Sequence, residues 1–204
     1  MIRFPSSSLF DPHNNLLLTQ LDLDIQDLER VAIVGRNGCG KTTLLRNIAG
    51  LDSSAAPSVQ VPAGRRISFV PTRPLDLLLP WKSVSKNLEF FESLAANTKE
   101  VDSNAKALNL LSATGFPITS SMGKPVYTLS SGQQAILALH CGLLQRPDVL
   151  VIDEIISTLA ACLRLSVADI LRGHSCTIVC ASHDADFVAR LGARLYNLEP
   201  FCPN

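Results

Sequence analysis

The chain has 204 residues, of which 47% are hydrophobic, and its 18 basic side chains balance 18 acidic ones. This length suits one domain with a small inserted subdomain, and the hydrophobic fraction excludes a disordered chain. A neutral chain without a basic run argues against nucleic acid as the main partner, although Arg65 and Arg66 leave room for a local patch. No stretch reaches the roughly 20 apolar residues of a membrane-spanning helix, and no signal peptide is expected. The six cysteines lack CxxC spacing and are expected to be reduced, mostly buried thiols.

Strand-like and helical segments alternate along most of the chain. The hydrophobic patterns predict strands at 16–25 and 30–35, two short strands within 56–71, and later strands at 149–153, 176–182 and 194–199. They predict helices at 41–50, 84–96 and 104–113, after residue 131, at about 158–172 and at 185–191, with a loop at 115–124. Buried β-branched strands that alternate with helices predict an α/β fold with a mostly parallel sheet covered on both faces.

The stretch "GRNGCGKTT" fits the phosphate-loop pattern G-x-x-x-x-G-K-[ST], between a buried strand and a helix. Glycines let such a loop wrap closely enough for backbone N–H groups to face phosphate oxygens. Lys41 is expected to reach the β- and γ-phosphates, and the Thr42 hydroxyl to bind Mg²⁺. The predicted phosphate-binding residues are Gly35, Arg36, Asn37, Gly38, Cys39, Gly40, Lys41, Thr42 and Thr43.

A second motif, "VLVIDE", supplies carboxylates after an apolar strand. Asp153 is expected beside the Mg²⁺ with Thr42, and Glu154 is suited to polarising the attacking water. With the phosphate loop, these residues predict a nucleoside triphosphatase.

Together the motifs "GRNGCGKTT", "LSSGQ", "VLVIDE" and "SHD", in that order, resemble the ATP-binding cassette (ABC) ATPases over nearly the whole chain. The resemblance implies a P-loop NTPase core at 1–72 and about 129–204, with an antiparallel N-terminal β subdomain and a helical subdomain inserted at about 73–128. It also implies that ATP and Mg²⁺ are bound and that His183 contacts the γ-phosphate. Two cassettes, identical or different, are expected to pack head to tail, so that the signature of one chain closes over the nucleotide of the other. The expected signature residues are Leu129, Ser130, Ser131, Gly132 and Gln133.

Several positions depart from the family pattern. Thr72 stands where the family usually has a glutamine that reaches Mg²⁺, and Ile155 follows Glu154 in place of proline. Ala160 lacks a carboxylate that couples the two sites of the dimer, and Ser131 replaces a glycine. Phe10 is the nearest candidate for stacking on adenine. Since Glu154 remains, slow but real hydrolysis is expected.

The apolar stretch from Leu77 to Trp81 is expected to dock a membrane subunit, and "LLPW" resembles importer cassettes for nitrate, sulfonate and taurine-like substrates. Packing of these residues inside the helical subdomain is the alternative interpretation. The implied location is cytoplasmic, peripheral at the membrane, and no C-terminal regulatory domain is expected. Three other functional classes stay open: a soluble cassette that acts on the ribosome, an exporter cassette whose membrane domain lies elsewhere, and a degenerate cassette that regulates a partner.

Overall fold

The computed structural model describes residues 1–11, 13, 15–52, 59–95 and 110–202. Its strands are β1 (Ile2–Phe10), β2 (Leu16–Ile25), β3 (Arg30–Val34), β4 (Ile67–Val70), β5 (Val149–Asp153), β6 (Thr177–Ala181) and β7 (Arg194–Asn197). Its α-helices are α1 (Lys41–Ile48), α2 (Val84–Leu94), α4 (Ile118–Ser121), α5 (Ser131–Leu144), α6 (Ala161–Arg172) and α7 (Ala185–Leu191). Short 3₁₀ helices lie at Pro74–Asp76, Val126–Thr128, Ile155–Thr158 and Glu199–Phe201.

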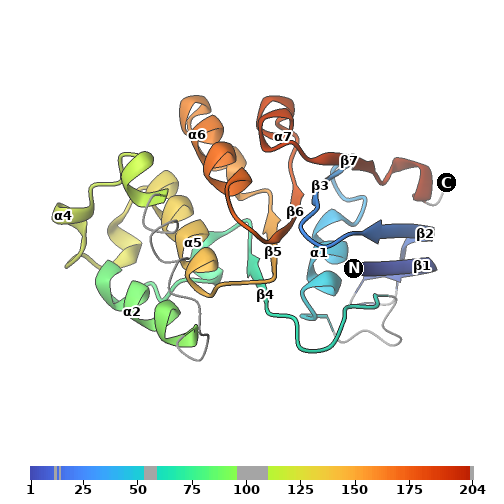
Figure 1. Ribbon diagram of the computed structural model, residues 1–204, viewed down its shortest axis with the longest axis horizontal. Coiled ribbons are helices and arrows are strands. Elements are labelled where there is room, and N and C mark those ends of the chain that lie inside the picture. Colours follow the sequence, from blue (N-terminus) through green and yellow to red (C-terminus); the bar gives the residue numbers. More distant parts are fainter. Residues whose placement is uncertain (12, 14, 53–58, 96–109, 203–204) are drawn as a thin grey trace.

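A five-stranded parallel sheet with the order β4-β5-β6-β3-β7 forms the centre of the molecule (Figure 1). The strands that precede the two predicted motifs, β3 and β5, are separated by β6 alone. Because all the strands run in one direction, the loops that follow them meet at the carboxyl edge of the sheet. This edge holds the candidate site.

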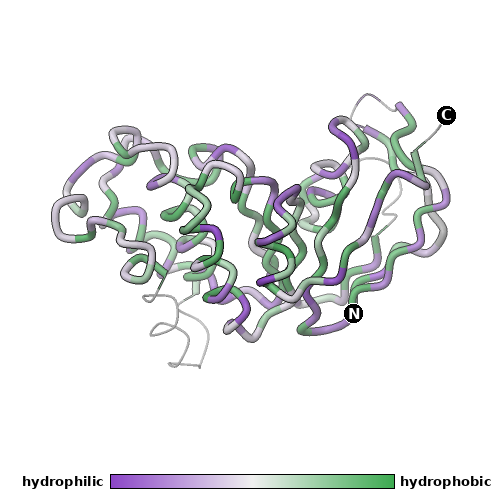
Figure 2. Tube along the Cα trace, turned by 90° about the horizontal axis from the view of Figure 1, so that it is seen from above, coloured by the Kyte–Doolittle hydropathy of each residue, from purple (hydrophilic) through white to green (hydrophobic). Residues whose placement is uncertain are grey.

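Side chains alternate between two apolar cores on the two faces of the sheet, as the pleat of a strand requires. One face, toward α5, α6 and α7, carries Ala32, Leu150, Ile152, Ile178 and Cys180. The other, toward α1 and the β1–β2 pair, carries Val31, Ile33, Val149, Val151, Val179 and Ala181. The apolar colouring in Figure 2 follows these inner strands and α5. Because both faces of the sheet are buried, the sequences of these strands are continuous runs of apolar residues.

A helical lobe of α2, α4 and α5 lies at one end of the molecule (Figure 1, left). Helix α5 joins the lobe to the sheet at Gly142, where an added Cβ would stand 2.7 Å from Cγ2 of Val70. Only a glycine permits such close contact between this helix and β4. Helices α2 and α4 lie within residues 73–128, the range predicted for an inserted helical subdomain, and this division of the chain stays a prediction.

The loop that leads into α2 is fixed by a buried amide. Asn87 is completely buried, and its side chain accepts from the Leu79 N–H at 2.8 Å and donates to the Leu79 and Ser83 carbonyls at 3.1 and 3.0 Å. The segment from Leu79 to Ser83, which contains Trp81, is therefore held in place by a side chain of α2.

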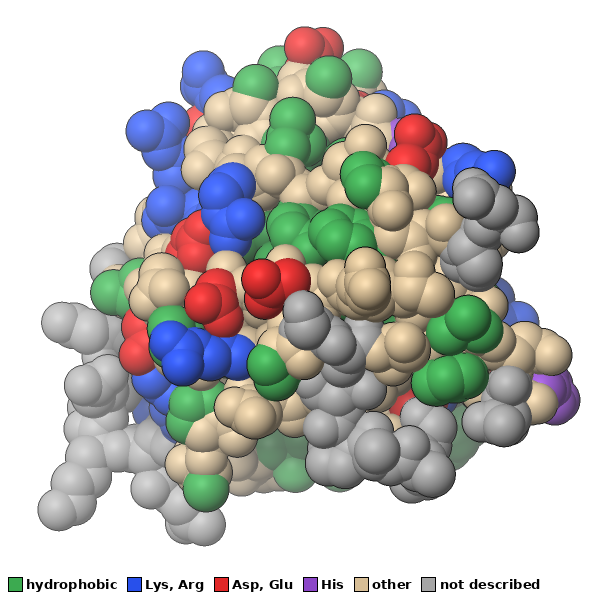
Figure 3. Space-filling model, turned by 90° about the vertical axis from the view of Figure 1, so that its right-hand side faces the viewer, with side chains coloured by type: hydrophobic (Ala, Val, Ile, Leu, Met, Phe, Trp, Pro, Cys, Tyr) green, Lys and Arg blue, Asp and Glu red, His purple; other side chains and the backbone are tan. Residues whose placement is uncertain are grey.

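Strands β1 and β2 pair antiparallel at the other end of the molecule, near both termini (Figure 1, right). Strand β1 was not among the individual strands predicted, because Pro5 and three serines conceal its pattern. The ladder shifts register after Phe4, at this proline. The face in Figure 3 mixes basic and acidic side chains with small apolar groups.

The structure corrects several predicted boundaries. Of the two short strands predicted within 56–71, β4 forms, while Gln60 makes an isolated bridge to Arg3. The helix predicted from about residue 158 begins at Ala161, after a 3₁₀ turn, and the predicted loop at 115–124 contains α4. The helix predicted at 104–113 lies mainly outside the described residues. Its described part, residues 110–113, is helical. Across the described part of the chain, no helix has both the length and the apolar character needed to span a membrane.

Candidate functional site

The phosphate-loop segment forms a tight turn between β3 and α1. Gly35 has a φ of 151°, and an added Cβ would lie 2.8 Å from the Cys39 sulfur, so both the backbone and the space require glycine. Lys41 is 6% exposed, and its Nζ donates to the Gly35 and Arg36 carbonyls at 2.9 and 3.2 Å. Two carbonyls therefore fix the Lys41 ammonium inside the turn of the loop.

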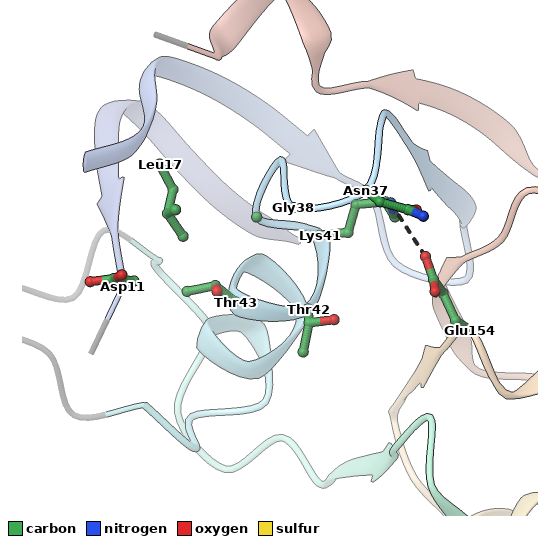
Figure 4. Close-up of a pocket in the computed structure, with 9 residues that line it drawn as sticks. Asp11, Leu17, Asn37, Gly38, Lys41, Thr42, Thr43 and Glu154 are labelled. Carbon is green, nitrogen blue, oxygen red and sulfur yellow. Dashed lines mark ion pairs between the residues drawn. The ribbon is translucent and has the colours of Figure 1, made fainter. Parts of the chain in front are cut away.

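A pocket of about 320 Å³ lies beside this loop (Figure 4). Its lining includes six phosphate-loop and α1 residues, together with Asp11 and Leu17 from the β1–β2 end and Glu154 from the far side: Asp11, Leu17, Asn37, Gly38, Gly40, Lys41, Thr42, Thr43 and Glu154. Phe10, the candidate for adenine stacking, is 37% exposed and is not in this lining. Leu17 is the apolar side chain that the structure places there.

Asp153 ends β5 with its carboxylate between two hydroxyl groups. Thr42 Oγ1 lies 3.1 and 3.0 Å from its two oxygens, and Thr72 Oγ1 donates to Oδ2 at 2.9 Å. Burial raises the pKa of Asp153, and the bonds from Thr72 and Thr42 oppose that effect. A carboxylate and hydroxyls are oxygen ligands of the kind that Mg²⁺ prefers, so these residues fit the expected metal. The position at which the family usually has glutamine thus contacts Asp153 directly.

Glu154 lies between Lys41 and His183. Its Oε1 is 3.3 Å from Lys41 Nζ and 3.3 Å from His183 Nε2, and Figure 4 marks the lysine pair. Glu154 has a φ of 48°, in the left-handed region that non-glycine residues seldom adopt. Its N–H donates to the Ala181 carbonyl on β6 at 3.1 Å, which holds this backbone at the edge of the sheet. Strained backbone of this kind is frequent at functional sites.

The predicted signature begins α5 and lies apart from this pocket. Ser130 is the N-cap, with its hydroxyl accepting from the Gln133 N–H at 3.3 Å, while the Gln133 side chain accepts from the Ser130 N–H at 3.1 Å. This reciprocal capping box fixes the start of the helix. Leu129 is buried, Ser130 and Ser131 are exposed, and none of the five signature residues lines the pocket of this chain.

The structure adds four side chains near Glu154 that the sequence analysis did not assign to the site: Ser157, Arg164, Ser182 and Asp184. A second pocket of about 190 Å³ is lined by Glu154, Ser157, Arg164, Ser182, His183 and Asp184. Arg164 carried no sequence signal, since it lies within an ordinary helical pattern. Asp184 followed His183 in a quoted motif, and its position before a short helix is typical of an N-cap.

A glycine loop between a parallel strand and a helix, with an aspartate at the end of a nearby strand, defines a P-loop nucleoside triphosphatase. The profile of the ABC transporter family matches residues 18–157, which contain the phosphate loop, the signature and both carboxylates. The chain therefore belongs to the ABC transporter family, and it is an ATP-binding cassette of the ATPase class.

Curated relatives agree with this assignment. The chain is 34% identical over 187 residues to the aliphatic sulfonates import ATP-binding protein SsuB 2 of Frankia alni, covering 89% of this chain and 71% of that protein. It is 36% identical to SsuB 1 of Pseudomonas syringae pv. tomato, over 86% of this chain and 62% of that protein. SsuB of Escherichia coli K12 is 33% identical, with 91% and 72% covered. The chain thus spans about two thirds of the length of these relatives, between 62% and 72%.

Solved structures share the fold. The ATP-binding cassette MJ0796, described as a post-hydrolysis dimer bound to ADP and Pi, has a TM-score of 0.76 and 21% identity over 97% of this chain and 94% of that one. CbiO1 of Clostridium perfringens, described as part of an ABC transporter complex, has a TM-score of 0.72 and 24% identity over 97% and 84%. The P-loop α/β fold expected from the sequence is confirmed.

Proposed function

We propose that this chain binds MgATP, closes with a second cassette around two nucleotides, hydrolyses the ATP and drives a membrane transporter. One observation carries the proposal: Glu154 contacts both Lys41 and His183 at 3.3 Å, at the rim of a pocket formed by the phosphate loop. The Lys41 ammonium, which is proposed to bind phosphate, and the Glu154 carboxylate, which is proposed to act as the base, therefore lie next to each other at the place proposed for the γ-phosphate.

The chain's own residues supply the main parts of phosphoryl transfer. Backbone N–H groups of the loop and the Lys41 ammonium bind the phosphates, and Thr42 with Asp153 holds the metal. Bound Mg²⁺ would neutralise charge that develops on the phosphate oxygens. Glu154 accepts the proton of the attacking water, and His183 orients the γ-phosphate. Hydrolysis is expected to be slow, because Thr72 binds Asp153 and its side chain is shorter than the usual glutamine.

The partner cassette is expected to supply its signature to the nucleotide of this chain. Within its own chain, Gly132 has no steric need to be glycine, because an added Cβ would meet only the Thr158 carbonyl, at 3.8 Å. Glycine near the start of a helix costs up to about 1 kcal/mol relative to alanine. A close approach by a group from outside the chain, such as a phosphate held by the partner, explains the residue.

Docking of a membrane subunit is proposed at the loop before α2. Within the predicted stretch, Leu78 is buried in the core and Leu77 is half-buried against it, while Trp81 is 69% exposed. Tyr127 is 61% exposed, and its N–H donates to the Pro80 carbonyl at 3.2 Å, so its backbone lies beside that of Trp81. The proposed docking surface is therefore the aromatic pair Trp81 and Tyr127, with the leucines mainly packing inward.

The relatives are named as aliphatic sulfonates import ATP-binding proteins, which supports an importer for aliphatic sulfonates as the proposed assembly. The proposed role implies a location at the cytoplasmic side of a membrane. The alternative, a regulatory cassette paired with an active one, is favoured by Ala160, which caps α6 without a side-chain hydrogen bond. Purification from the native host discriminates between them, because co-purification of a different, fully active cassette favours the alternative.

The activity is tested by comparing wild type with Glu154→Gln. ATP turnover should vanish in the variant while binding of ATP remains, because the base is lost but the phosphate contacts are kept. Gly132→Ala tests the dimer: it should abolish ATP-induced association, whereas Gly123→Ala, where an added Cβ meets nothing within 4 Å, should not. Equal turnover in wild type and Glu154→Gln would overturn the proposed mechanism.

A further inference from the structure

The side chain of Arg164 joins two loops that lead away from the candidate catalytic pair. Its Nε donates to the Leu159 carbonyl at 2.8 Å and its Nη2 to the Ser157 carbonyl at 3.1 Å, both in the segment between β5 and α6. Its Nη1 donates to Oδ2 of Asp184, after β6, at 2.7 Å. One guanidinium therefore connects the loop that begins at Glu154 with the loop that contains His183.

The first loop fixes the backbone of Glu154. The N–H and the hydroxyl of Ser157 both point to the Glu154 carbonyl, at 3.1 and 2.8 Å. Glu154 is held in a left-handed conformation that costs of order 1 kcal/mol or more for a residue with a Cβ. Arg164 holds this same turn at its far end, through Ser157 and Leu159.

The second loop is held on both sides of His183. Asp184 divides its carboxylate: Oδ1 accepts from the Phe187 N–H at 2.8 Å as the N-cap of α7, and Oδ2 pairs with Arg164. The Asp184 N–H donates to the Ser182 hydroxyl at 3.2 Å. The His183 side chain is half-exposed and contacts Glu154 at 3.3 Å, so a shift of the backbone around it would move the ring relative to that carboxylate.

We propose that Arg164 is a positioning residue for ATP hydrolysis, which ties Ser157 and Leu159 to Asp184 and thereby keeps His183 against Glu154. The inference rests on the proposed function. Arg164 lines the second pocket together with both members of the pair, yet its three hydrogen bonds go to the loops. Its action on the reaction is therefore indirect.

An arginine suits this role for a geometric reason. Its planar fork presents several donors in fixed directions, whereas a lysine ammonium acts as a single point charge. Three acceptors on two loops can be served together only by such a fork. A misplacement of about 1 Å in a catalytic group can lower a rate by about 100-fold.

The same two helices provide a matched control. Arg190 of α7 binds Asp169 of α6 through two hydrogen bonds of 2.6 and 2.7 Å. This pair also joins α6 to α7, but neither residue lines the two pockets. A variant that loses this ion pair shows how much the attachment of α6 to α7 alone contributes to kcat.

The experiment measures kcat and KM for ATP on the full chain, together with the melting temperature. In Arg164→Ala, kcat should fall by about 10- to 100-fold while KM changes by less than about threefold, because the nucleotide contacts are untouched. Arg164→Lys should recover little of the rate, and Asp184→Asn should lose a comparable amount. The double variant should be no worse than Arg164→Ala, because both changes break one link. Arg190→Ala should keep the wild-type kcat.

Two results overturn the inference. One is a kcat for Arg164→Ala within about twofold of wild type; the other is an equal loss in Arg190→Ala. If the wild-type protein shows no ATP turnover, the proposed function is refuted and kcat cannot test the role of Arg164. A second measurement that does not depend on hydrolysis is therefore included. The imidazole ¹H–¹³C resonance of His183, assigned by its loss in His183→Gln, should shift or broaden in Arg164→Ala and stay unchanged in Arg190→Ala. An unchanged His183 resonance in Arg164→Ala overturns the inference whatever the activity.

Discussion

Nζ of Lys41 lies 3.3 Å from Oε1 of Glu154, so the residue expected to bind phosphate and the residue expected to activate water form an ion pair with each other. Lys41 is buried and Glu154 is about one third exposed, which places the pair at the rim of the pocket. If Lys41 binds phosphate as proposed, the phosphate oxygens of a nucleotide compete with this carboxylate for the same ammonium.

This competition predicts that Glu154→Gln binds ATP more tightly than wild type. The neutral amide gives up an ion pair worth up to about 1 kcal/mol, which corresponds to an increase in affinity of about two- to fivefold. Titration with a non-hydrolysable ATP analogue measures it without interference from turnover. Glu199→Gln, at a residue that lines neither pocket, is the control. Weaker binding by Glu154→Gln would contradict the competition.

The hydroxyl of Thr72 is expected to govern the affinity for Mg²⁺. It donates to Asp153 at 2.9 Å, and partners of this kind orient a metal-binding carboxylate. Thr72→Val keeps the shape but removes the donor, so the Mg²⁺ concentration for half-maximal ATP binding should rise about tenfold. Thr72→Ser keeps the hydroxyl and should behave as wild type. An identical Mg²⁺ requirement in Thr72→Val would show that this hydrogen bond has no influence on the metal.

Asn87 is expected to stabilise the loop that carries Trp81. Asn87→Leu removes three hydrogen bonds and leaves the Leu79 N–H without its partner, so the free energy of unfolding should fall by about 2–3 kcal/mol. Urea denaturation measures the change. Asn47→Leu, which removes one bond to the Thr43 carbonyl within α1, should cost less than about 1 kcal/mol. Equal costs at the two positions would argue against a special role for Asn87.

Asp184 is expected to make stability depend on pH at the acidic end. The backbone N–H of Phe187 and then Arg164 hold the pKa of Asp184 below its ordinary value of 3.8. Because the folded pKa is the lower one, the stabilising contribution is present above pH 3.8 and is lost as pH falls through the folded pKa. Asp184→Asn keeps a capping side chain without the charge, so it should be about 1 kcal/mol less stable than wild type at pH 7. The gap should shrink as the pH falls below 3.8 and through the lower folded pKa, as measured by urea denaturation at each pH. A gap that stays constant until Asp184 is fully protonated would mean that the charge is not the cause.

Local patterns were sufficient to predict the parts of the fold that depend on near neighbours. The phosphate loop, β3, α1 and β5 were predicted because glycine spacing and continuous apolar runs act over a few residues. Strand β1 was missed because Pro5 masks a strand that is stabilised by pairing with β2. The start of α6 was placed too early because a 3₁₀ turn, held by bonds to Glu154 and Ile155, occupies 155–158.

Short local motifs are enough to assign the class of this protein: a phosphate loop, a signature, paired carboxylates and a histidine are each recognisable within a few residues. Which of these groups touch one another depends on the folded arrangement. Thr72 and Asp153 are 81 residues apart in the chain, and their contact depends on the pairing of β4 with β5. The bridge from Arg164 to Asp184 likewise depends on β5 lying beside β6. The physical reason is that strand order and helix packing are set by burial across the whole core, which no single segment encodes.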